Sequence, residues 1–205
     1  MLKSRHEDQL VLNIIRISGN ELNEHLLDVA RLRIRVFRDF PYLYDGDLDY
    51  EKRYLQTYSQ SQGSVVVLAM DEDRVVGAST AIPLEHETQE VIAPFVAAGY
   101  ATDSIFYFGE SVLLPEYRDR GIGVSFFEHR EAHARQTGGF TQCCFCAVQR
   151  PADHPARPAD YQPLDTFWEK RGYKRQSDLV AYYSWKESGE QEESPKPMVF
   201  WMKSL

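Results

Sequence analysis

The sequence predicts an α/β protein of the α+β type, in which helices are interleaved with the strands of one mixed sheet. Three observations support this fold class. Apolar runs of strand length recur along the chain, as in Val65–Met70. Stretches in which apolar residues have helical spacing lie between them, as in Glu21–Phe37. The 205 residues and an apolar share of 43 % suit one domain with one sizeable core.

The first part of the chain predicts a strand, two helices and a strand hairpin. The opening stretch is rich in β-branched residues, and the first helix is expected to end before Pro41. Asp71 to Arg74 form a turn between two apolar runs, which indicates a hairpin. The expected elements are a strand at 10–18, helices at 21–37 and 50–59, and paired strands at 65–70 and 75–83.

The second part predicts an irregular insertion followed by alternating strands and helices. Gly109 inside one strand indicates a bulge or a close approach by another backbone. The acidic segment 187–196 predicts a solvated hairpin tip rather than a site. The expected elements are a short helix near 89–98, a strand at 104–114, a helix at 121–136, a strand at 140–148, a long proline-rich loop at 150–163, a short helix at 164–171, and strands at 173–186 and 197–204.

The charge and the apolar runs exclude several classes of protein. The chain has 23 basic and 31 acidic residues, which gives a formal charge of −8. The overall electrostatic field of such a chain disfavours binding to nucleic acid or to an anionic membrane. No apolar run approaches the roughly 20 residues of a membrane span, and the first residues lack the apolar stretch of a signal peptide. We therefore expect a cytoplasmic protein with one domain over residues 1–205, of which 1–9 form a tail.

The three cysteines, Cys143, Cys144 and Cys146, lie in one expected strand. No other cysteine is present to build a disulfide framework, which favours a reducing compartment. Neighbouring residues of a strand point to opposite faces, and no fourth ligand has the spacing of a metal site. We expect these cysteines to be small hydrophobic residues of a core strand, and we expect no metal.

The segment between the strand at 104–114 and the helix at 121–136 carries the chemistry. The first amides of a helix lack intrahelical partners and lie at the positive end of its dipole. Gly121 and Gly123 let an anion approach the backbone, and Arg118 and Arg120 add charge. This arrangement suits a pyrophosphate. The P-loop and dinucleotide motifs both fail, because no lysine follows Gly123 and Phe126 stands at the third glycine.

The stretch Arg118-Asp-Arg-Gly-Ile-Gly123 matches the pattern Arg/Gln-x-x-Gly-x-Gly/Ala and resembles the acetyl-CoA motif of the GNAT superfamily of N-acetyltransferases. Residues Thr166–Tyr173 look like the second signature of that family, Phe-Tyr-x-x-x-Gly-Phe/Tyr. The order of elements from about residue 10 onward also resembles the family. The resemblance implies a GNAT-like acyl-CoA N-acyltransferase fold, with a mixed central sheet splayed around the cofactor and helices on both faces.

The resemblance further implies acetyl-CoA as co-substrate. Main-chain amides around the glycines would hold the pyrophosphate, while the end of the preceding strand would pair with the pantetheine arm and polarise the thioester carbonyl. Such a backbone donor can be worth about 3 kcal/mol. The cofactor-binding residues implied are Val112, Leu113, Leu114, Arg118, Asp119, Arg120, Gly121, Ile122, Gly123, Val124, Phe167 and Trp168.

Acetyl transfer to a protonated amine needs a base, and the candidates lie on the expected strand at 104–114. Glu110 is the first candidate, since many members of the family carry an acid there; the alternative is a partly buried carboxylate paired with an arginine. Tyr107 is a second candidate, and both would face one cleft only if Gly109 bulges. Trp168 stands where the family usually has a tyrosine that protonates the thiolate, and an indole cannot do so. Water or another tyrosine would then act, and Tyr173 is the candidate chosen.

The acceptor cleft is expected between the loops around Tyr42 and Tyr44 and the last strands, with Tyr183. We interpret Asp45, Asp47, Asp49 and Glu51 as turn and helix-start residues. The expected activity is transfer of an acetyl group to a primary amine of a small molecule or peptide by direct attack in a ternary complex. A non-catalytic CoA-binding or regulatory module, or an unrelated domain that binds another phosphate ligand, remain as alternatives. The terminal hairpin could also pair two copies in a homodimer.

Overall fold

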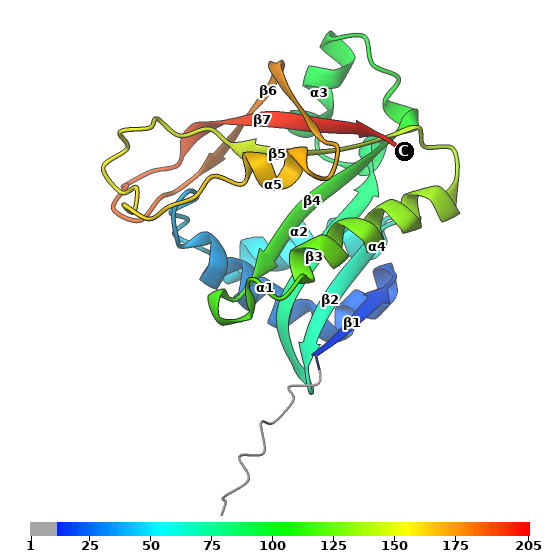
Figure 1. Ribbon diagram of the computed structural model, residues 1–205, viewed down its shortest axis with the longest axis horizontal. Coiled ribbons are helices and arrows are strands. Elements are labelled where there is room, and N and C mark those ends of the chain that lie inside the picture. The colour runs from blue at the N-terminus through cyan, green and yellow to red at the C-terminus, as the bar shows by residue number, and fades with distance from the viewer. Residues whose placement is uncertain (1–11) are drawn as a thin grey trace, which may run out of the picture.

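The computed structural model describes residues 12–205, so the expected tail lies outside the described residues. Figure 1 shows strands that run diagonally in one half of the sheet and across the molecule in the other. The strands are β1 Leu12–Ile17, β2 Val65–Asp71, β3 Arg74–Pro83, β4 Ile105–Leu113, β5 Gln142–Val148, β6 Lys174–Trp185 and β7 Ser194–Ser204. The α-helices are α1 Leu22–Phe37, α2 Leu48–Gln60, α3 Gln89–Ala97, α4 Ile122–Thr137 and α5 Asp165–Glu169. Short 3₁₀ turns are η1 Gly19–Glu21, η2 Leu84–His86, η3 Thr102–Ser104 and η4 Pro115–Tyr117.

The strands form one seven-stranded sheet in the order β1-β2-β3-β4-β5-β7-β6. Every neighbouring pair is antiparallel except β4 and β5, so the prediction of a mixed sheet is confirmed. The parallel pair is short, because only Ile105 to Tyr107 face partners, Gln142 to Cys144. Beyond Tyr107 the two strands diverge, and Figure 1 shows β4 and β5 opening away from each other.

Helices cover both faces of the sheet, as expected. Figure 1 places α1 and α2 behind strands β2 to β4 and α4 in front of them. The larger buried cluster packs α1 and α2 on the sheet, includes Leu22, Leu55 and Tyr107, and extends to Ile122 and Phe126 at the start of α4. The other lies on the α4 side and includes Phe108, Phe127 and Tyr173. The amphipathic pattern of the first helix explains its place, since α1 buries Leu22, Val29, Ala30 and Leu32.

Most predicted boundaries agree with the observed ones within a few residues. Helix α2 begins two residues earlier than predicted, because Asp47 Oδ1 accepts a hydrogen bond from Tyr50 N at 2.6 Å and caps the helix. Strand β7 begins at Ser194 rather than at residue 197. The prediction for the cysteines is confirmed, because all three are free and buried in β5. Their side chains fill the core as small hydrophobic groups.

A bulge in β4 at Gly109 decides which side chains reach which face. Ser79 of β3 faces Ser111 and Ala81 faces Phe108, so two residues of β4 lie opposite one residue of β3. A Cβ on Gly109 would overlap the Tyr58 hydroxyl and come within 2.5 Å of Thr80 Oγ1. The bulge therefore needs glycine, and it puts Tyr107 and Glu110 on the same face of the sheet despite their odd separation.

Arg130 of α4 holds this bulge from the opposite face. Its Nη1 donates to the carbonyl of Glu110 at 3.2 Å and to that of Thr80 at 3.3 Å, and its Nη2 donates to Ser111 Oγ at 2.9 Å. The side chain is 2 % exposed, and this burial lowers the pKa of Arg130 to about 10. The guanidinium therefore satisfies carbonyls that the interrupted strand pairing leaves free.

Candidate active site

The amide turn, residues 118–124, connects η4 to the start of α4. Gly121 caps the helix with φ at +80°, a left-handed conformation that favours glycine, and Asp119 also has a positive φ of 60°. The amides of Val124 and Ser125 donate to Gly121 O at 3.0 and 3.1 Å. Within residues 12–205 the amides from Asp119 to Gly123 donate no hydrogen bond. Free donors therefore gather at the positive end of a 16-residue helix.

The side chains around the amide turn leave its donors accessible. Arg118 and Arg120 are exposed, and Arg120 Nη2 donates to Glu116 O at 2.9 Å. A Cβ on Gly123 would lie 3.3 Å from Phe167 Cζ, so a side chain there would fill the space between the turn and α5. These residues fit the pyrophosphate of CoA, because the donor set consists of main-chain amides at the start of a helix and two exposed guanidinium groups.

The open edge of β4 begins where β5 leaves it. From Phe108 to Leu113 this edge pairs with no strand in the described part of the chain. Leu114 N donates to Val76 O at 3.0 Å, so Leu114 and, by the alternation of an antiparallel ladder, Val112 direct their main-chain groups toward β3. The main chain of Leu113 consequently points to the open edge. Of the three residues expected to pair with an amide arm, Leu113 is the one whose groups remain available.

The aromatic residues of the second signature lie on the α4 side of the sheet. The ring of Phe167 packs at 6.0 Å from that of Phe127, and Trp168 packs at 5.1 Å from Phe145 and from Trp201. Tyr173 is 1 % exposed and donates from its hydroxyl to Glu131 Oε1 at 3.1 Å. Burial raises the pKa of Tyr173. The structure thus does not bring Tyr173 to Glu110 and Tyr107, and its hydroxyl is poorly suited to protonate a thiolate.

Glu110 projects from the bulge toward α1 and α2. Its Oε2 lies 2.6 Å from Arg33 Nη1 and accepts a hydrogen bond from the Tyr54 hydroxyl at 3.0 Å. Its Oε1 is buried and has no hydrogen-bond partner among residues 12–205. The residue therefore combines the two alternatives considered from the sequence: it is a buried carboxylate paired with an arginine, and it keeps one oxygen free to accept a proton.

Arg33 joins this carboxylate to a second one. Its Nε donates to Glu51 Oε2, and its guanidinium carbon lies 4.2 Å from the centre of the Tyr54 ring. Burial alone would lower the pKa of Arg33, but the Glu110 and Glu51 carboxylates raise it well above its ordinary value. Glu51 lies in the first turn of α2, as expected from the sequence. The sequence did not predict that its side chain is also fully buried against Arg33.

These residues belong to a larger group whose members come from four parts of the chain. Tyr58 of α2 contacts Tyr54 and Glu87, and it extends the group to the end of η2. Sequence reasoning missed Arg33, although one signal was available: Arg33 follows Val29 by one helical turn and so stands on the apolar stripe of α1. We call the group the acid–tyrosine cluster; it consists of Arg33, Glu51, Tyr54, Tyr58, Glu87 and Glu110.

Tyr107 and Tyr183 meet at Cys146, next to the divergence of β4 and β5. The Tyr107 hydroxyl lies 3.2 Å from Cys146 Sγ, which in turn lies 3.5 Å from the Tyr183 hydroxyl. Burial raises the pKa of Cys146 to about 11, so the thiol is neutral near pH 7. Burial and, to a smaller extent, Cys146 raise the pKa of Tyr42. Tyr44 lies apart, where its hydroxyl accepts from Asp47 N at 3.4 Å.

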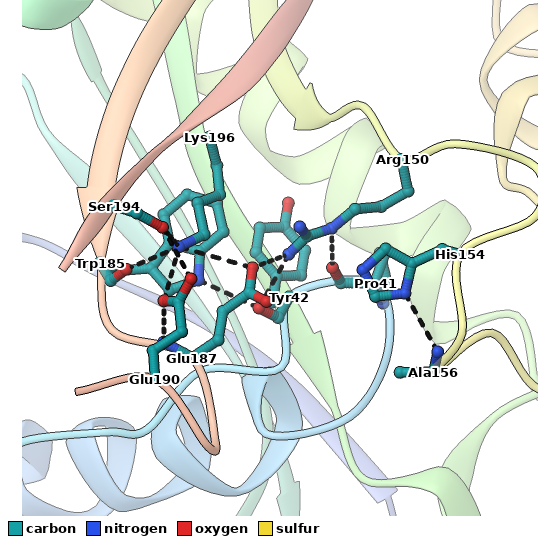
Figure 2. A network of polar contacts seen from close by, with 10 residues as sticks. All are labelled: Pro41, Tyr42, Arg150, His154, Ala156, Trp185, Glu187, Glu190, Ser194 and Lys196. Atoms are coloured by element: carbon teal, nitrogen blue, oxygen red, sulfur yellow. Dashed lines mark hydrogen bonds and ion pairs between the residues drawn. The ribbon is translucent and has the colours of Figure 1, made fainter. Parts of the chain in front are cut away.

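The loop around Tyr42 is held by two segments that follow it much later in the chain (Figure 2). Arg150 donates to the carbonyls of Pro41 and Tyr42 at 2.7 and 3.2 Å and pairs with Glu187 at 2.5 Å. Trp185 Nε1 also donates to Tyr42 O, at 3.0 Å. This network fixes the loop that carries Tyr42. Arg150 and Trp185 carried no motif, and only the fold places them against the loop.

The expected solvated tip between β6 and β7 is partly wrong. Figure 2 shows Lys196, 4 % exposed, between the carboxylates of Glu187 and Glu190. Lys196 Nζ donates to Glu190 Oε2 at 2.9 Å and to Trp185 O at 2.9 Å. The hydrogen bond from Lys196 is the main reason that the pKa of Glu190 falls to about 2. Glu187 and Glu190 therefore neutralise a buried lysine, whereas Glu192 and Glu193 of the same tip are exposed, as expected.

Two hollows of about 340 and 350 Å³ share Arg31 and Arg35 of α1, and neither is lined by Glu110. The second also borders Arg74 and Leu114. Among residues 12–205, no three His, Cys, Asp or Glu side chains are grouped to hold a metal ion. None of the helices in this part of the chain has both the length and the apolar character needed to cross a bilayer.

Comparison with known proteins identifies the class that this fold and site define. Residues 26–159, more than half of the chain, match the model of the acetyltransferase (GNAT) family, and the chain therefore belongs to that family. No match was found among curated proteins. Among solved structures, the fold is shared with many acetyltransferases, as expected from the sequence motif.

Three of these structures illustrate the likeness. A ribosomal-protein-alanine N-acetyltransferase from Brucella melitensis has a TM-score of 0.61 at 13 % identity, over 94 % of this chain and 99 % of that one. A GNAT-family acetyltransferase from Streptococcus pneumoniae gives 0.58 at 12 %, over 95 % and 99 %. A Salmonella typhimurium protein, whose structure holds its cofactor acetyl-CoA, gives 0.58 at 10 %, over 95 % and 94 %. At such low identities the likeness shows the fold alone.

Proposed function

We propose that this protein transfers the acetyl group of acetyl-CoA to a primary amine of a small molecule or a peptide, by direct attack in a ternary complex. Membership of the acetyltransferase family supports the reaction class. The observation that carries the assignment is the position of Glu110. Its unpartnered Oε1 belongs to the same strand whose open edge leads to the amide turn, so a base and an anion site share one strand.

The residues for the cofactor are the free amides from Asp119 to Gly123 and the main chain of Leu113. The amides would hold the pyrophosphate at the start of α4, and Leu113 would pair with the pantetheine arm like an added strand. Phe167 would cover the amide turn from the other side. When bound, acetyl-CoA supplies a thioester whose carbonyl carbon is the electrophile.

Glu110 would act as the base. A primary amine with a pKa of about 10 is protonated at neutral pH, and removing the proton costs about 4 kcal/mol at about 1.36 kcal/mol per unit. Glu110 Oε1 would accept that proton directly or through one water molecule. The amine nitrogen forms the new C–N bond as the C–S bond breaks, and its second proton balances the departing sulfur. One proton per turnover is therefore left in the protein.

The residues around Cys146 indicate the kind of acceptor. Tyr42, Tyr107 and Tyr183 bring aromatic rings and neutral hydroxyls together near the divergence of β4 and β5. The Glu110 carboxylate adds a negative group on the same face. Rings and a carboxylate together suit an amphipathic cation of modest size.

Release of free thiol from acetyl-CoA, measured with a panel of small amines and short peptides, tests this proposal. We expect thiol release that depends on at least one amine and is absent without it. Binding of acetyl-CoA with no release across the whole panel would instead favour a non-catalytic CoA-binding module, which Trp168 at the usual tyrosine position already suggests as the second candidate. A melting temperature that nucleotides raise and CoA does not would contradict both.

A further inference from the structure

The acid–tyrosine cluster contains a continuous row of four oxygen atoms. Glu110 Oε2 lies 3.0 Å from the Tyr54 hydroxyl, which lies 2.9 Å from the Tyr58 hydroxyl. The Tyr58 hydroxyl lies 2.7 Å from Glu87 Oε1. All three separations are within the range of O–H···O hydrogen bonds. The row starts at Glu110, the proposed base, and ends at Glu87, the residue that follows η2.

The number of protons in this row decides whether it is unbroken. With both carboxyl groups ionised, each phenol donates to its carboxylate, and no proton lies between the Tyr54 and Tyr58 hydroxyls 2.9 Å apart. An unbroken row of three hydrogen bonds needs three protons, of which the two phenols supply one each. The third must belong to one of the two carboxyl groups. Glu110 faces the Arg33 guanidinium at 2.6 Å, whereas Glu87 pairs with no cation in the described part of the chain and is 8 % exposed. Burial raises the pKa of Glu87, in agreement with a proton that rests on this end.

We propose that Glu87, Tyr58 and Tyr54 form a proton relay that empties Glu110 after each acetyl transfer. This inference rests on the proposed function, which delivers one proton to Glu110 per turnover. At rest, Glu87 is protonated and Glu110 is ionised. When Glu87 gives its proton to water and Glu110 takes one from the amine, the row still holds three protons, now directed toward Glu87.

The return step balances atom by atom. Glu110 gives its proton to the Tyr54 oxygen, Tyr54 gives its own to Tyr58, and Tyr58 gives its own to Glu87. Three O–H bonds break and three form, and the net result is one proton moved from Glu110 to Glu87. Glu87 can exchange that proton with water because the residues beside it, Glu85, His86 and Thr88, are exposed.

The surroundings keep other groups from competing for this proton. Burial raises the pKa of the phenols and thiols near Glu87, so these groups stay neutral near pH 7. The backbone at the Gly109 bulge also confines the Tyr58 hydroxyl, because even a Cβ at this position would overlap it. Of the titratable groups around Glu87, Tyr58 contacts it directly. The others whose charge is coupled to that of Glu87 are Arg33 of α1, Tyr54 of α2, Tyr107 and Glu110 of β4, Cys144 and Cys146 of β5, and Tyr183 of β6.

Infrared difference spectroscopy of the whole protein tests the resting proton without any turnover. We expect the carbonyl stretch of a protonated carboxylic acid at neutral pH. It should disappear in Glu87→Gln and persist in Glu85→Gln, the matched control two residues away and exposed. Glutamine keeps both hydrogen bonds of Glu87 and should leave the fold intact. No such band, or a band that Glu110→Gln removes and Glu87→Gln does not, would overturn the relay.

Kinetics test the transfer itself. Tyr58→Phe and Glu87→Gln should each lower kcat at least about 10-fold with little change in KM for acetyl-CoA. Tyr50→Phe, on the exposed side of the same helix, should not. The dependence of kcat on the deuterium fraction of the solvent should be curved in the wild type, because several protons move together, and linear in Tyr58→Phe. An unchanged kcat and a curved dependence in both relay variants would overturn the proposal.

The two measurements separate the relay from the function on which it rests. If no amine is acetylated but the band of protonated Glu87 is present and lost in Glu87→Gln, the proposed function fails while the shared proton stands. If acetyl transfer occurs and the band is absent, the relay fails while the function stands.

Discussion

The amide turn follows the end of β4, and the acid–tyrosine cluster includes Glu110 of β4, yet the two are built in different ways. The amide turn uses main-chain groups of consecutive residues, held by Gly121 at the start of α4. The acid–tyrosine cluster uses side chains from α1, α2, β4 and the end of η2, up to 77 residues apart, from Arg33 to Glu110. A main-chain site tolerates many side chains and needs only a backbone conformation, whereas a side-chain cluster depends on each member.

The amide turn and the acid–tyrosine cluster also differ in whether their charge can change. The amides at the start of α4 carry partial charges that do not change with pH near neutrality. The carboxylates and phenols of the cluster can exchange protons, so the part of the site that must change its charge is built from side chains. Arg130 connects the two parts, because it extends from α4 to the carbonyl of Glu110.

The largest expected effect comes from closing the amide turn. Gly121→Glu should abolish acetyl-CoA binding, because a carboxylate would stand where the pyrophosphate is expected. Gly138→Glu is a control at the other end of α4: the two glycines have φ of 80° and 79°, and neither has an atom within 4 Å of an added Cβ. The control carries the greater backbone strain, because Gly121 has ψ of −5° and Gly138 has ψ of 166°, a region that is essentially restricted to glycine. Binding that survives in the control would therefore show that backbone strain is not what abolishes it. Isothermal calorimetry should show loss of binding in the first alone, and equal binding in both would contradict the placement.

The next effect comes from removing the base. Glu110→Gln should lower kcat about 100- to 10 000-fold and leave acetyl-CoA binding unchanged. The loss should be greatest at pH values below the pKa of the acceptor amine, where the amine is protonated. Glu116→Gln, exposed and on the segment that follows β4, should behave as the wild type. A pH–rate profile that does not change in Glu110→Gln would remove Glu110 from this role.

A smaller effect should follow from filling the bulge. Gly109→Ala should lower the free energy of unfolding by about 3 kcal/mol, at the upper end for overpacking, because its Cβ would overlap the Tyr58 hydroxyl. Chemical denaturation of Gly109→Ala, Tyr58→Phe and the double variant would measure the coupling. The double variant should recover part of the loss. Strictly additive changes would mean that the hydroxyl does not fill the space beside the bulge.

The smallest effect concerns the hairpin tip that sequence reasoning placed in solvent. Lys196 lowers the pKa of Glu190 from its usual 4.5 to about 2, so the folded state keeps this carboxylate ionised better than the unfolded state does. Its contribution is complete above about pH 4.5 and is lost as the pH falls through about 2. We expect at most about 1 kcal/mol, because the Glu190 side chain is 34 % exposed.

Melting temperatures of the wild type and Glu190→Gln should therefore differ at neutral pH and converge as the pH approaches 2. Glu192→Gln, exposed on the same tip, is the control. A difference that stays constant over this range would show that Lys196 does not stabilise the Glu190 carboxylate.

The sequence predicted the fold and the amide turn because both depend on local patterns. Apolar periodicity placed the helices and strands, and a glycine motif between a strand and a helix predicted an anion site in the turn that the structure shows at Gly121. Gly109 even predicted the bulge that brings Tyr107 and Glu110 to one face. Tyr173 was the opposite case: the second signature marks its position, but the sheet separates it from Glu110.

By itself, then, the sequence determined the class of fold, the turn that can hold a pyrophosphate and the strand that carries the acid. Only the tertiary structure decided that Arg33 and Glu51 are buried beside that acid, that Glu87 lies at the end of a row of hydroxyls, and that Arg150 and Lys196 hold the Tyr42 loop and the β6–β7 tip. The physical reason is how far apart in the sequence the interacting residues are. Helical dipoles and backbone turns arise between near neighbours in the chain, whereas a buried charge is tolerated only where the fold brings it a partner.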